Sequence, residues 1–385
     1  MTDPEAVRDR PGPGAPVENG HVIITGATGF IGAACVREFL ERGWRVTALG
    51  HRGGAGRLES FRGHARISLA LGSITEREAL ARVLAGRIAG AGGVCQALVH
   101  CAGRATDVGW DRRFRAANFV GVQNVCHAVS RLGIGRLIHM STTDVYGVRD
   151  FFGADETTPH ENNRRNPYPK YKILAEEHIR DSLPPDRYVI LRPALVWGPG
   201  DTTVLPRAIA FLRASPVILH FGRWRGRNRW PLAYVGNVAR IAYVAATCNA
   251  ALGEAYNVVD PEPITMDEYY HLLIDLFLPA QRSKRSLTVL FRLAWPVAAL
   301  STILSNLLDR QHPIYDPSLY GLRHVAHSQD FSGAKAAALL ESCGRTYVDR
   351  ATALEAAMAG RRNPGVGTTT GGGSSPPPPV SYRVK

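Results

Sequence analysis

The sequence predicts an α/β fold in which a doubly wound parallel sheet is covered by helices on both faces. Two observations support this prediction. Short aliphatic runs alternate with helical patterns over the first half of the chain, and a glycine-rich turn joins the first run to the first helical pattern. Strands that alternate with helices at this spacing are typical of βαβ units, in which the strands are parallel.

Six runs of β-branched or aliphatic residues are predicted to be strands. They lie at 22–25, 46–49, 67–71, 97–100, 137–140 and 188–191. Helices are predicted at 30–42, ending at Gly43, and near 112–132. Thr75 and Glu78 have the spacing of a capping box, which predicts a further helix that begins there.

The pattern changes along the chain. We expect the sheet domain to span residues 21–195, with later strands contributed from 230–260. Over 196–360 the periodicity loosens, which predicts a smaller C-terminal substrate-binding region. Residues 1–20 and the Gly-, Ser- and Pro-rich segment 361–385 are predicted to be disordered tails, because they cannot bury enough apolar surface to offset chain entropy.

The composition excludes several classes. The chain has 385 residues and a formal net charge of +13, but its basic residues are spread along the chain and no nucleic-acid partner is predicted. Its six cysteines lack metal-ligand spacing, so we predict reduced thiols and no metal site. The N-terminus lacks the apolar core of a signal peptide, which favours a cytoplasmic protein.

The glycine-rich turn has the form expected of a dinucleotide site. Gly26, Gly29 and Gly32 follow the first predicted strand and open the first predicted helix. The first permits a tight turn, the second lets the backbone approach a pyrophosphate, and the third lets the helix pack against the strand. Free N–H groups at the helix N-terminus would face the phosphates, so the sequence predicts NAD(P) as cofactor.

The end of the second strand bears on the choice between NAD and NADP. An acidic residue at this place would hold the ribose hydroxyls of NAD. Here Gly50 is followed by His51 and Arg52 instead, and a cation suits the 2′-phosphate of NADP. We therefore favour NADP, although Arg52 on a solvated loop would explain the same residues.

A tyrosine and a lysine four residues apart are candidates for catalysis. If the segment is helical, Tyr168 and Lys172 share one face. An ammonium near the phenol would favour the phenolate and lower its pKa, so that the pair could pass a proton to or from a substrate oxygen during hydride transfer. Pro169 is acceptable just inside a helix start, and Tyr171, adjacent to Lys172, is the weaker candidate.

Together these motifs resemble the extended short-chain dehydrogenase/reductases, of Rossmann-type fold, over roughly residues 21–360. The matching segments are TGATGFIG at 25–32, VHCAG at 99–103, NFVGVQN at 118–124, HMSTTDVYG at 139–147, YPKYK at 168–172, LRPALVWGPGD at 191–201 and YVGNVA at 234–239. Their order and spacing match the family, which is more specific than any one of them.

The resemblance implies roles for individual residues. Thr142 would hydrogen-bond the substrate oxygen, Tyr168 would be the acid/base with Lys172 as its partner, and Asn118 would support the proton relay. The remaining cofactor contacts that we predict are Thr28, Phe30, Ile31, Ser73, Ile74, Cys101, Ala102, Gly103, Pro193 and Val196. The resemblance also suggests a homodimer through the helices near 112–132 and 168–180.

Three features favour a lipophilic substrate. YVGNVA resembles the branch of 3β-hydroxysteroid dehydrogenases and 2-alkyl-3-ketoalkanoate reductases. Trp230 stands where nucleotide-sugar enzymes usually carry a diphosphate-binding arginine, and could be an apolar wall. The segment 286–308 is strongly apolar. We expect oxidation or reduction of a secondary alcohol or ketone on a steroid-like ring, an alkyl keto acid or a polyketide.

Other features leave two alternatives open. Arg223, Arg225, Arg227 and Arg229 could grip a diphosphate, a carboxylate or coenzyme A, or could be a solvated hairpin. Asp144 lies where dehydratases of nucleotide sugars place an acidic residue, so a nucleotide-sugar epimerase, dehydratase or reductase is the second hypothesis. A catalytically inactive, cofactor-sensing binding protein is the third, but such proteins typically lose the tyrosine.

The apolar segment 286–308 invites a membrane hypothesis. Its uncharged stretch, between Arg292 and Asp309, is 16 residues long and is shorter than the ~20 that span a bilayer. Pro296 would kink a helix there or start a new one. We expect a lid over the substrate pocket or a shallow interfacial helix, with possible peripheral membrane contact, and a core helix is the alternative.

Overall fold

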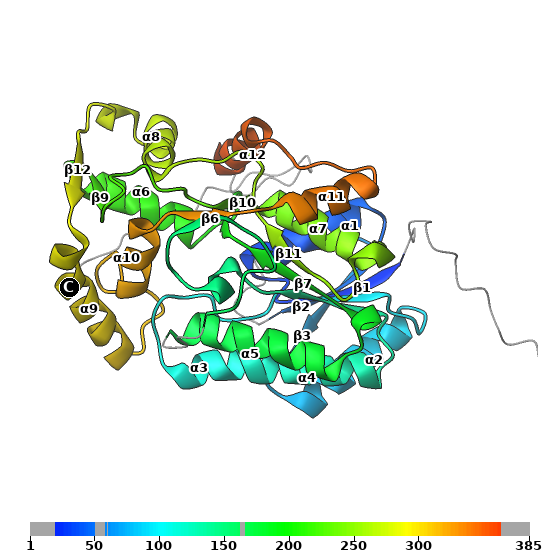
Figure 1. Cartoon of the computed structure of the whole chain (residues 1–385). Helices are drawn as coiled ribbons and strands as arrows, with labels where there is room; N and C mark the ends of the chain where they lie inside the picture. The colour runs from blue at the N-terminus through cyan, green and yellow to red at the C-terminus, as the bar shows by residue number, and fades with distance from the viewer. Residues whose placement is uncertain (1–19, 51–57, 60, 162–165, 363–385) are drawn as a thin grey trace, which may run out of the picture.

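The computed structural model describes residues 20–50, 58–59, 61–161 and 166–362 (Figure 1). Its centre is a sheet of seven parallel strands in the order β11-β7-β5-β4-β1-β2-β3. The strands are β1 (His21–Thr25), β2 (Arg45–Gly50), β3 (Ile67–Leu71), β4 (Ala97–His100), β5 (Arg136–Met140), β7 (Tyr188–Pro193) and β11 (Ala255–Val258). All six predicted strands are present, and β11 comes from a later part of the chain.

Helices cover both faces of this sheet, which confirms the doubly wound α/β class (Figure 1). One face carries α1 (Phe30–Glu41), α7 (Val235–Thr247) and α11 (Ala334–Ser342). The other carries α2 (Arg77–Gly90), α4 (Gly121–Arg131) and α5 (Pro167–Ser182). The strands are buried on both sides, because each helix turns an apolar stripe toward them, and they therefore read as continuous aliphatic runs.

Two local predictions need correction. The helix expected near 112–132 is interrupted: α3 (Asp111–Arg115) is followed by a π-helical segment, Ala116–Val120, before α4 begins. The capping box was wrong, because α2 begins at Arg77 and no side chain caps it. The N-cap position is occupied by Glu76, and the Thr75 hydroxyl lies 2.7 Å from the Ser73 hydroxyl.

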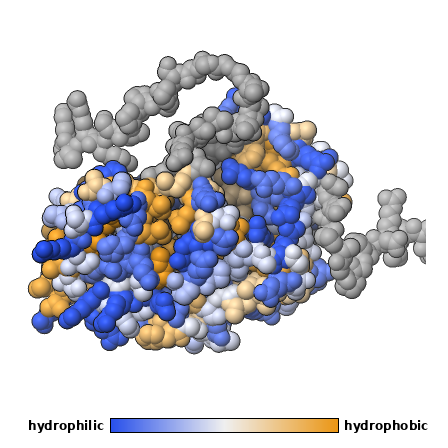
Figure 2. Space-filling view, turned by 90° about the horizontal axis from the view of Figure 1, so that it is seen from above, coloured by the Kyte–Doolittle hydropathy of each residue, from blue (hydrophilic) through white to orange (hydrophobic). Residues whose placement is uncertain are grey.

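The rest of the chain builds a second layer above the carboxyl ends of the strands. Three two-stranded parallel sheets pair β6 (Phe151–Ala154) with β13 (Gln329–Phe331), β8 (Leu195–Trp197) with β10 (Leu232–Tyr234), and β9 (Ile218–Phe221) with β12 (Ser286–Val289). Its helices are α6 (Val204–Ala214), α8 (Met266–Phe277), α9 (Phe291–Leu307), α10 (Leu319–Ala326) and α12 (Arg350–Arg362). On the side that carries α8, α11 and α12, polar side chains cover much of the surface and apolar ones gather in the hollows between them (Figure 2).

Helix α9 turns its large apolar side chains outward. Leu293, Val297, Leu300 and Leu307 follow one another at intervals of three, four or seven residues and are between 57% and 70% exposed. The buried positions of the helix are the small residues Ala298, Ser301 and Ser305. This arrangement excludes a core helix, and Pro296 lies inside the single helix that forms. Within the described residues, no helix is both long enough and apolar enough to cross a membrane.

Hydroxyl groups on the inner side of α9 hold the segment that leads into α10. The Ser301 hydroxyl donates to the Tyr315 carbonyl oxygen at 2.8 Å. The Ser305 and Thr302 hydroxyls accept from the backbone N–H groups of Ile314 and Leu319, at 2.9 and 2.8 Å. Helix α9, residues 314–319 and α10 are therefore joined by side-chain hydrogen bonds, and we call them the cap.

The tight packing of the first helix makes a testable prediction. A Cβ added at Gly32 would lie 2.1 Å from the Gly26 carbonyl oxygen, so Gly32→Ala must displace backbone. We expect it to lower the free energy of unfolding by about 2 kcal/mol, as measured by urea denaturation. A Cβ at Gly86 in α2 meets nothing within 4 Å, and Gly86→Ala should instead stabilise by about 0.5–1 kcal/mol. Equal effects of the two variants would contradict this account.

Candidate functional site

The glycine turn between β1 and α1 lies against the loop that follows β4. Gly26 has a φ of +67°, which L side chains rarely adopt. A Cβ there would also lie 2.6 Å from the Ala102 backbone nitrogen, so the two loops are in backbone contact. The turn closes with a 2.8 Å hydrogen bond from the Gly29 N–H to the Gly26 carbonyl oxygen. The structure thus brings Gly26, Gly29, Gly32 and the 101–103 loop together.

This turn suits a dinucleotide. The first N–H groups of a helix have no partner within it, and α1 has neither a capping side chain nor an acidic residue in its first turn. An anion would therefore meet N–H donors and no competing carboxylate. Ser73 and Ile74 follow β3 at the same edge of the sheet, and the Ile74 carbonyl oxygen accepts from the Asn124 amide at 2.9 Å. His51 and Arg52 lie outside the described residues.

Two of the candidate catalytic hydroxyls meet at the carboxyl end of β5. Thr142 caps the short 3-10 helix Thr143–Tyr146, and its hydroxyl accepts from the Asp144 N–H at 3.2 Å. Tyr168 is in the first turn of α5, where the Asn166 side chain caps the helix at 2.9 Å. The Thr142 hydroxyl lies close enough to the Tyr168 phenol to lower its pKa. One substrate oxygen could contact both.

Lys172 lies one helical turn further along α5 and is buried. Its ammonium donates to the Met140 carbonyl oxygen at 2.6 Å. A Cβ at Gly103 would come within 3.7 Å of the Lys172 nitrogen and 2.9 Å of the Asn118 oxygen, so both side chains lie under the 101–103 loop. Asn118 clamps this loop by accepting from the Arg104 N–H at 2.7 Å and donating to the Arg104 carbonyl at 2.9 Å.

The pKa values of this pair follow from burial. Burial and the charge of Asp144 raise the pKa of Tyr168, against the effect of the hydrogen bond from Thr142. Burial lowers the pKa of Lys172 to about 8, although Cys101 and Glu176 act in the other direction. The expectation that the lysine lowers the tyrosine pKa is therefore not met in the protein alone, where the ammonium is hydrogen-bonded to Met140 instead.

A buried ion pair fixes α5, and the sequence analysis missed it. Glu176 accepts from the Arg192 guanidinium at 2.6 and 3.0 Å and from the Ser141 hydroxyl at 2.6 Å. Burial alone would raise the pKa of Glu176, but hydrogen bonds from His160 and Arg192 and the charge of Arg192 hold it well below its usual range. Two features of the sequence could have indicated the Glu176–Arg192 ion pair. Glu176 is four residues after Lys172, and Arg192 is a charged residue within an otherwise aliphatic strand.

On the substrate side, α10 brings two residues that were also missed. The Tyr320 hydroxyl donates to Asp144 at 2.6 Å, and the His324 ring lies 3.7 Å from the same carboxylate oxygen. Burial and the charge of Asp144 raise the pKa of Tyr320 well above its usual value. Neither residue falls in a motif, because α10 is more than 140 residues from Tyr168 in the chain and only the fold brings it there.

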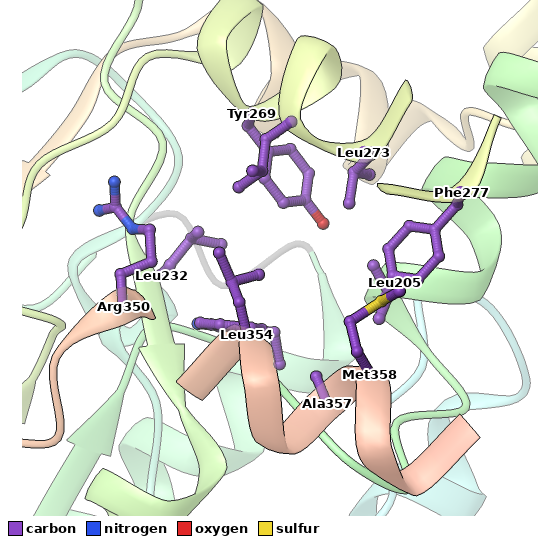
Figure 3. Close-up of a pocket in the computed structure, with 11 residues that line it drawn as sticks. Leu205, Leu232, Tyr269, Leu273, Phe277, Arg350, Leu354, Ala357 and Met358 are labelled. Atoms are coloured by element: carbon purple, nitrogen blue, oxygen red, sulfur yellow. The ribbon is translucent and has the colours of Figure 1, made fainter. Parts of the chain in front are cut away.

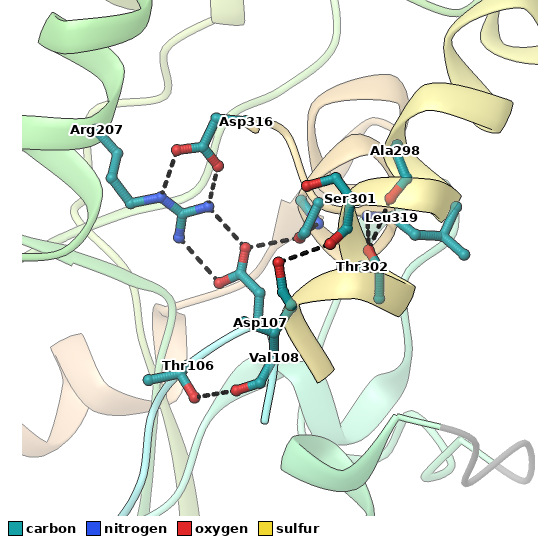
Figure 4. Close-up of polar contacts among 12 residues, drawn as sticks. Thr106, Asp107, Val108, Arg207, Ala298, Ser301, Thr302, Asp316 and Leu319 are labelled. Atoms are coloured by element: carbon teal, nitrogen blue, oxygen red, sulfur yellow. Dashed lines mark hydrogen bonds and ion pairs between the residues drawn. The ribbon is translucent and has the colours of Figure 1, made fainter. Parts of the chain in front are cut away.

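A second charged group closes the site beside α10 (Figure 4). Arg207 on α6 donates to both carboxylate oxygens of Asp107, at 2.9 and 2.7 Å, and also binds Asp316. The Ser318 hydroxyl, at the N-terminus of α10, donates to Asp107 at 2.8 Å. Arg207 therefore joins the loop after β4 to the cap.

The other candidate substrate residues lie apart from this group. Trp230 is buried among the side chains of α8, with its ring 6.1 Å from that of Tyr269. Trp230 and Arg229 border a cavity of about 340 Å³ whose other walls include residues 231–232, 259–264, 329–331 and Tyr347. None of the residues that line it is a candidate for catalysis or cofactor binding. Arg223, Arg225, Arg227 and Arg229 are all exposed.

A further crevice lies under α12 (Figure 3). Leu205, Leu273, Phe277, Leu354 and Met358 are among its walls, and the Tyr269 hydroxyl points into it. Its volume is about 20 Å³, enough for roughly one water molecule and too small for a substrate.

Comparison with known proteins places these features in a family. Residues 22–258 match the model of the NAD dependent epimerase/dehydratase family. A 2-alkyl-3-oxoalkanoate reductase of Stenotrophomonas maltophilia is 30% identical over 74% of this chain and 84% of its own length. A 3 beta-hydroxysteroid dehydrogenase/Delta 5-->4-isomerase of Mycobacterium tuberculosis is 29% identical over 66% of this chain and 68% of its own.

Solved structures agree on the fold. UDP-glucuronic acid 4-epimerase from Bacillus cereus, in complex with UDP-glucuronic acid and NAD, superimposes with a TM-score of 0.65 at 19% identity, covering 88% of this chain and 98% of its own.

The buried lysine makes a pH prediction. Because the folded pKa of about 8 lies below the usual 10.5, the unfolded chain binds more protons between these values, and this group adds stability as pH rises through that range. From pH 8 to pH 10 the wild type should gain about 2 kcal/mol relative to Lys172→Met, measured by urea denaturation of both proteins. A difference independent of pH would show that Lys172 titrates normally.

Proposed function

Because the chain belongs to the NAD-dependent epimerase/dehydratase family, we propose that it interconverts a secondary alcohol and a ketone on a lipophilic substrate, with NAD(P) as cofactor. The observation that supports the proposal is the proximity of Thr142 and Tyr168 at the carboxyl end of β5, with Lys172 one turn further along α5 under the 101–103 loop. The bound dinucleotide would supply the hydride chemistry, and the protein would supply orientation and a proton.

Each residue then has a defined task. Thr142 and Tyr168 hold the substrate oxygen, and Tyr168 donates its proton to it when a ketone is reduced or accepts it when an alcohol is oxidised. Lys172, one helical turn along α5 and anchored on Met140, is the cation that we propose favours the phenolate of Tyr168 during the reaction. Asn118 fixes the 103–104 backbone below the cofactor. The residues that would hold the dinucleotide are Gly26, Thr28, Gly29, Phe30, Ile31, Gly32, Ser73, Ile74, Cys101, Ala102, Gly103, Pro193 and Val196.

We propose NADP as the preferred form of the cofactor. The support lies in the sequence: no carboxylate follows β2, and His51 and Arg52 follow it instead. A cation there would pair with the 2′-phosphate that NAD lacks.

A lipophilic alcohol or ketone is the favoured substrate. The relatives named above are a ketoalkanoate reductase and a hydroxysteroid dehydrogenase. A nucleotide sugar is the alternative, since Asp144, which accepts from the Tyr320 hydroxyl at 2.6 Å, could act as an acid or base. A diphosphate needs free cations, however, and Arg207 is already shared by two carboxylates.

Replacing the proposed acid/base tests the function. Tyr168→Phe should lower turnover of NADPH-dependent ketone reduction by about 10²-fold or more, because the phenyl ring has no proton to give. Fluorescence titration should still detect NADPH binding, tighter than that of NADH. Tyr171→Phe is the matched control: its hydroxyl donates to Asp111 at 2.5 Å, and turnover should be nearly unchanged. Normal activity in Tyr168→Phe would remove this residue from the role.

We further propose that the exposed face of α9 rests on a membrane surface. Leu293, Val297, Leu300 and Leu307 form an apolar stripe, and the exposed Arg285, Arg292 and Arg310 near its ends would meet anionic headgroups. The helix would lie in the interface and not span it.

Vesicle binding tests this contact. The protein should co-sediment with phosphatidylglycerol vesicles and be released by carbonate, and Val297→Glu should weaken binding about 10-fold or more, because it places a charge in the apolar stripe. Val94→Glu, at an exposed site in the loop before β4, should bind as the wild type does. Identical binding of the two variants would argue against α9 as the contact.

A homodimer is our proposal for the assembly. Helices α4 and α5 lie side by side on the outer face of the sheet (Figure 1). The rings of Phe119, in the π-helical segment, and His178 on α5 meet at 6.1 Å and remain partly exposed. An aromatic patch of this kind is typical of a helix-pair interface.

A further inference from the structure

We propose that Cys101 and Cys35 are a modification site, at which hydrogen peroxide forms a reversible disulfide that weakens dinucleotide binding. The inference rests on the proposed function, because it takes the glycine turn and the 101–103 loop as the dinucleotide site. It goes beyond that function, since it couples the enzyme to the oxidation state of its surroundings. Both thiols are free in the structure, which describes the reduced form.

The two cysteines come from neighbouring segments of the sheet layer. Cys101 directly follows β4, and its N–H donates to the Thr25 carbonyl oxygen, at the end of β1, at 3.1 Å. Cys35 is in α1, the helix that follows β1, and is fully buried. Both side chains belong to the apolar cluster on this face of the sheet. The thiols are close enough for Cys101, together with burial, to raise the pKa of Cys35 well above its usual value.

The two thiols differ in their access to an oxidant. Cys101 is partly exposed, and it also interacts with Lys172, where it opposes the lowering of the lysine pKa by burial. A thiolate that forms at Cys101 therefore faces an ammonium group, and partly exposed thiols near a cation and a second cysteine are typical of redox-sensitive sites. Cys35 is out of reach of solvent. Cys101 is therefore the thiol that meets the oxidant, and Cys35 is the thiol that completes the disulfide.

The reaction balances with peroxide as the only oxidant. The Cys101 sulfur attacks one peroxide oxygen, so that an S–O bond forms and the O–O bond breaks, and the departing hydroxide takes the Cys101 thiol proton and becomes water. The Cys35 sulfur then attacks the sulfenic sulfur of Cys101, so that the S–S bond forms and the S–O bond breaks. The Cys35 proton leaves with this hydroxide as a second water. The two sulfurs together lose two electrons, and one peroxide is reduced to two water molecules.

The disulfide would distort the glycine turn. Its sulfurs must come to about 2 Å from each other, closer than two thiols in contact. Helix α1 is held in place, because at Gly32 it packs so tightly that a Cβ would lie 2.1 Å from the Gly26 carbonyl oxygen. The 101–103 loop must therefore move, although its backbone already contacts Gly26 and the Asn118 side chain holds its far end through two hydrogen bonds. Movement of this loop changes the surface that the dinucleotide would contact.

Peroxide treatment of the whole chain tests the disulfide. After brief treatment, removal of peroxide with catalase and alkylation of the remaining thiols, peptide mass spectrometry should find the Cys35 and Cys101 peptides joined. Fluorescence titration should show NADPH affinity lowered by about 10-fold or more, because the binding-competent form is depleted, and dithiothreitol should restore it. NADPH at about a hundred times its Kd, added before peroxide, should slow formation of the joined peptides by at least 10-fold, because bound nucleotide holds the loop in its open position.

Three variants locate the effect. Cys35→Ala removes the thiol that completes the disulfide, and should bind NADPH as the reduced wild type does and keep its affinity after peroxide. Cys126→Ala is the matched control, at an equally buried cysteine on α4, and should lose affinity as the wild type does. Cys343→Ala tests a second pair of neighbouring thiols, Cys248 and Cys343, and should also respond as the wild type does. Protection by Cys343→Ala would assign the effect to that second pair and overturn the proposal.

Peptide mapping separates this inference from the proposed function. It needs neither nucleotide nor a variant, so it decides the modification site even if Cys35→Ala does not fold. If Cys35 and Cys101 become joined in a protein that binds no NADPH and reduces no ketone, the proposed function fails and the modification site stands. If NADPH binds and ketones are reduced, but the two peptides are never joined, the inference is overturned and the function stands. Joined peptides with unchanged NADPH affinity would overturn the proposed effect on binding.

Discussion

The burial of the Lys172 ammonium is the constraint on which the rest of the site depends. A cation that is taken out of water needs fixed partners, and the fold provides the Met140 carbonyl oxygen directly and the Glu176 carboxylate one turn further along α5. Glu176 is itself held by Arg192 and Ser141, so α5 is joined to β7 by an ion pair and to the residue after β5 by a hydrogen bond. Removing one partner of a buried ion pair such as Glu176 and Arg192 typically lowers the free energy of unfolding by about 3–5 kcal/mol.

The parallel sheet explains why these groups meet at all. The carboxyl ends of β1, β4 and β5 lie at one edge, so the glycine turn, the 101–103 loop and Thr142 are neighbours although they are far apart in the chain. The Gly26 φ of +67° and the contact with Ala102 bring the two loops together. The cap then covers this edge, and α10 delivers Tyr320 opposite Tyr168. The loops that follow β1, β4 and β5 are thus positioned by the sheet, while the substrate side of the site is built by the second layer.

The sequence predicted the sheet layer well and the second layer poorly, for physical reasons. Buried strands and the turn that includes Gly26 have local signatures, so their positions follow from period and residue type. Tyr168 and Lys172 are four residues apart and also carry a local signal. Tyr320 and Arg207 carry no local signal in the sequence, because their partners Asp144 and Asp107 are about 100 residues or more away in the chain. Trp230, which the sequence analysis proposed as a substrate wall, packs near Tyr269 and borders the cavity of about 340 Å³.

Smaller differences have local causes. The Thr75–Glu78 spacing fits a capping box, but Ser73 is nearby and bonds the Thr75 hydroxyl. The π-helical segment around Asn118 has no simple sequence pattern, although such segments are frequent at functional sites. It fits the position of Asn118, whose amide must reach the Arg104 backbone on both sides.

The hydrogen bonds that hold α9 to residues 314–319 within the cap depend on the surrounding medium. Apolar packing between helices loses its driving force when the surroundings are as apolar as the side chains, whereas a hydrogen bond grows stronger as the dielectric constant falls. Ser301, Thr302 and Ser305 hold the segment 314–319 through hydroxyl groups. These hydrogen bonds would therefore become stronger on contact with a lipid phase or a detergent, whereas the apolar packing between Ala298 and α10 would become weaker.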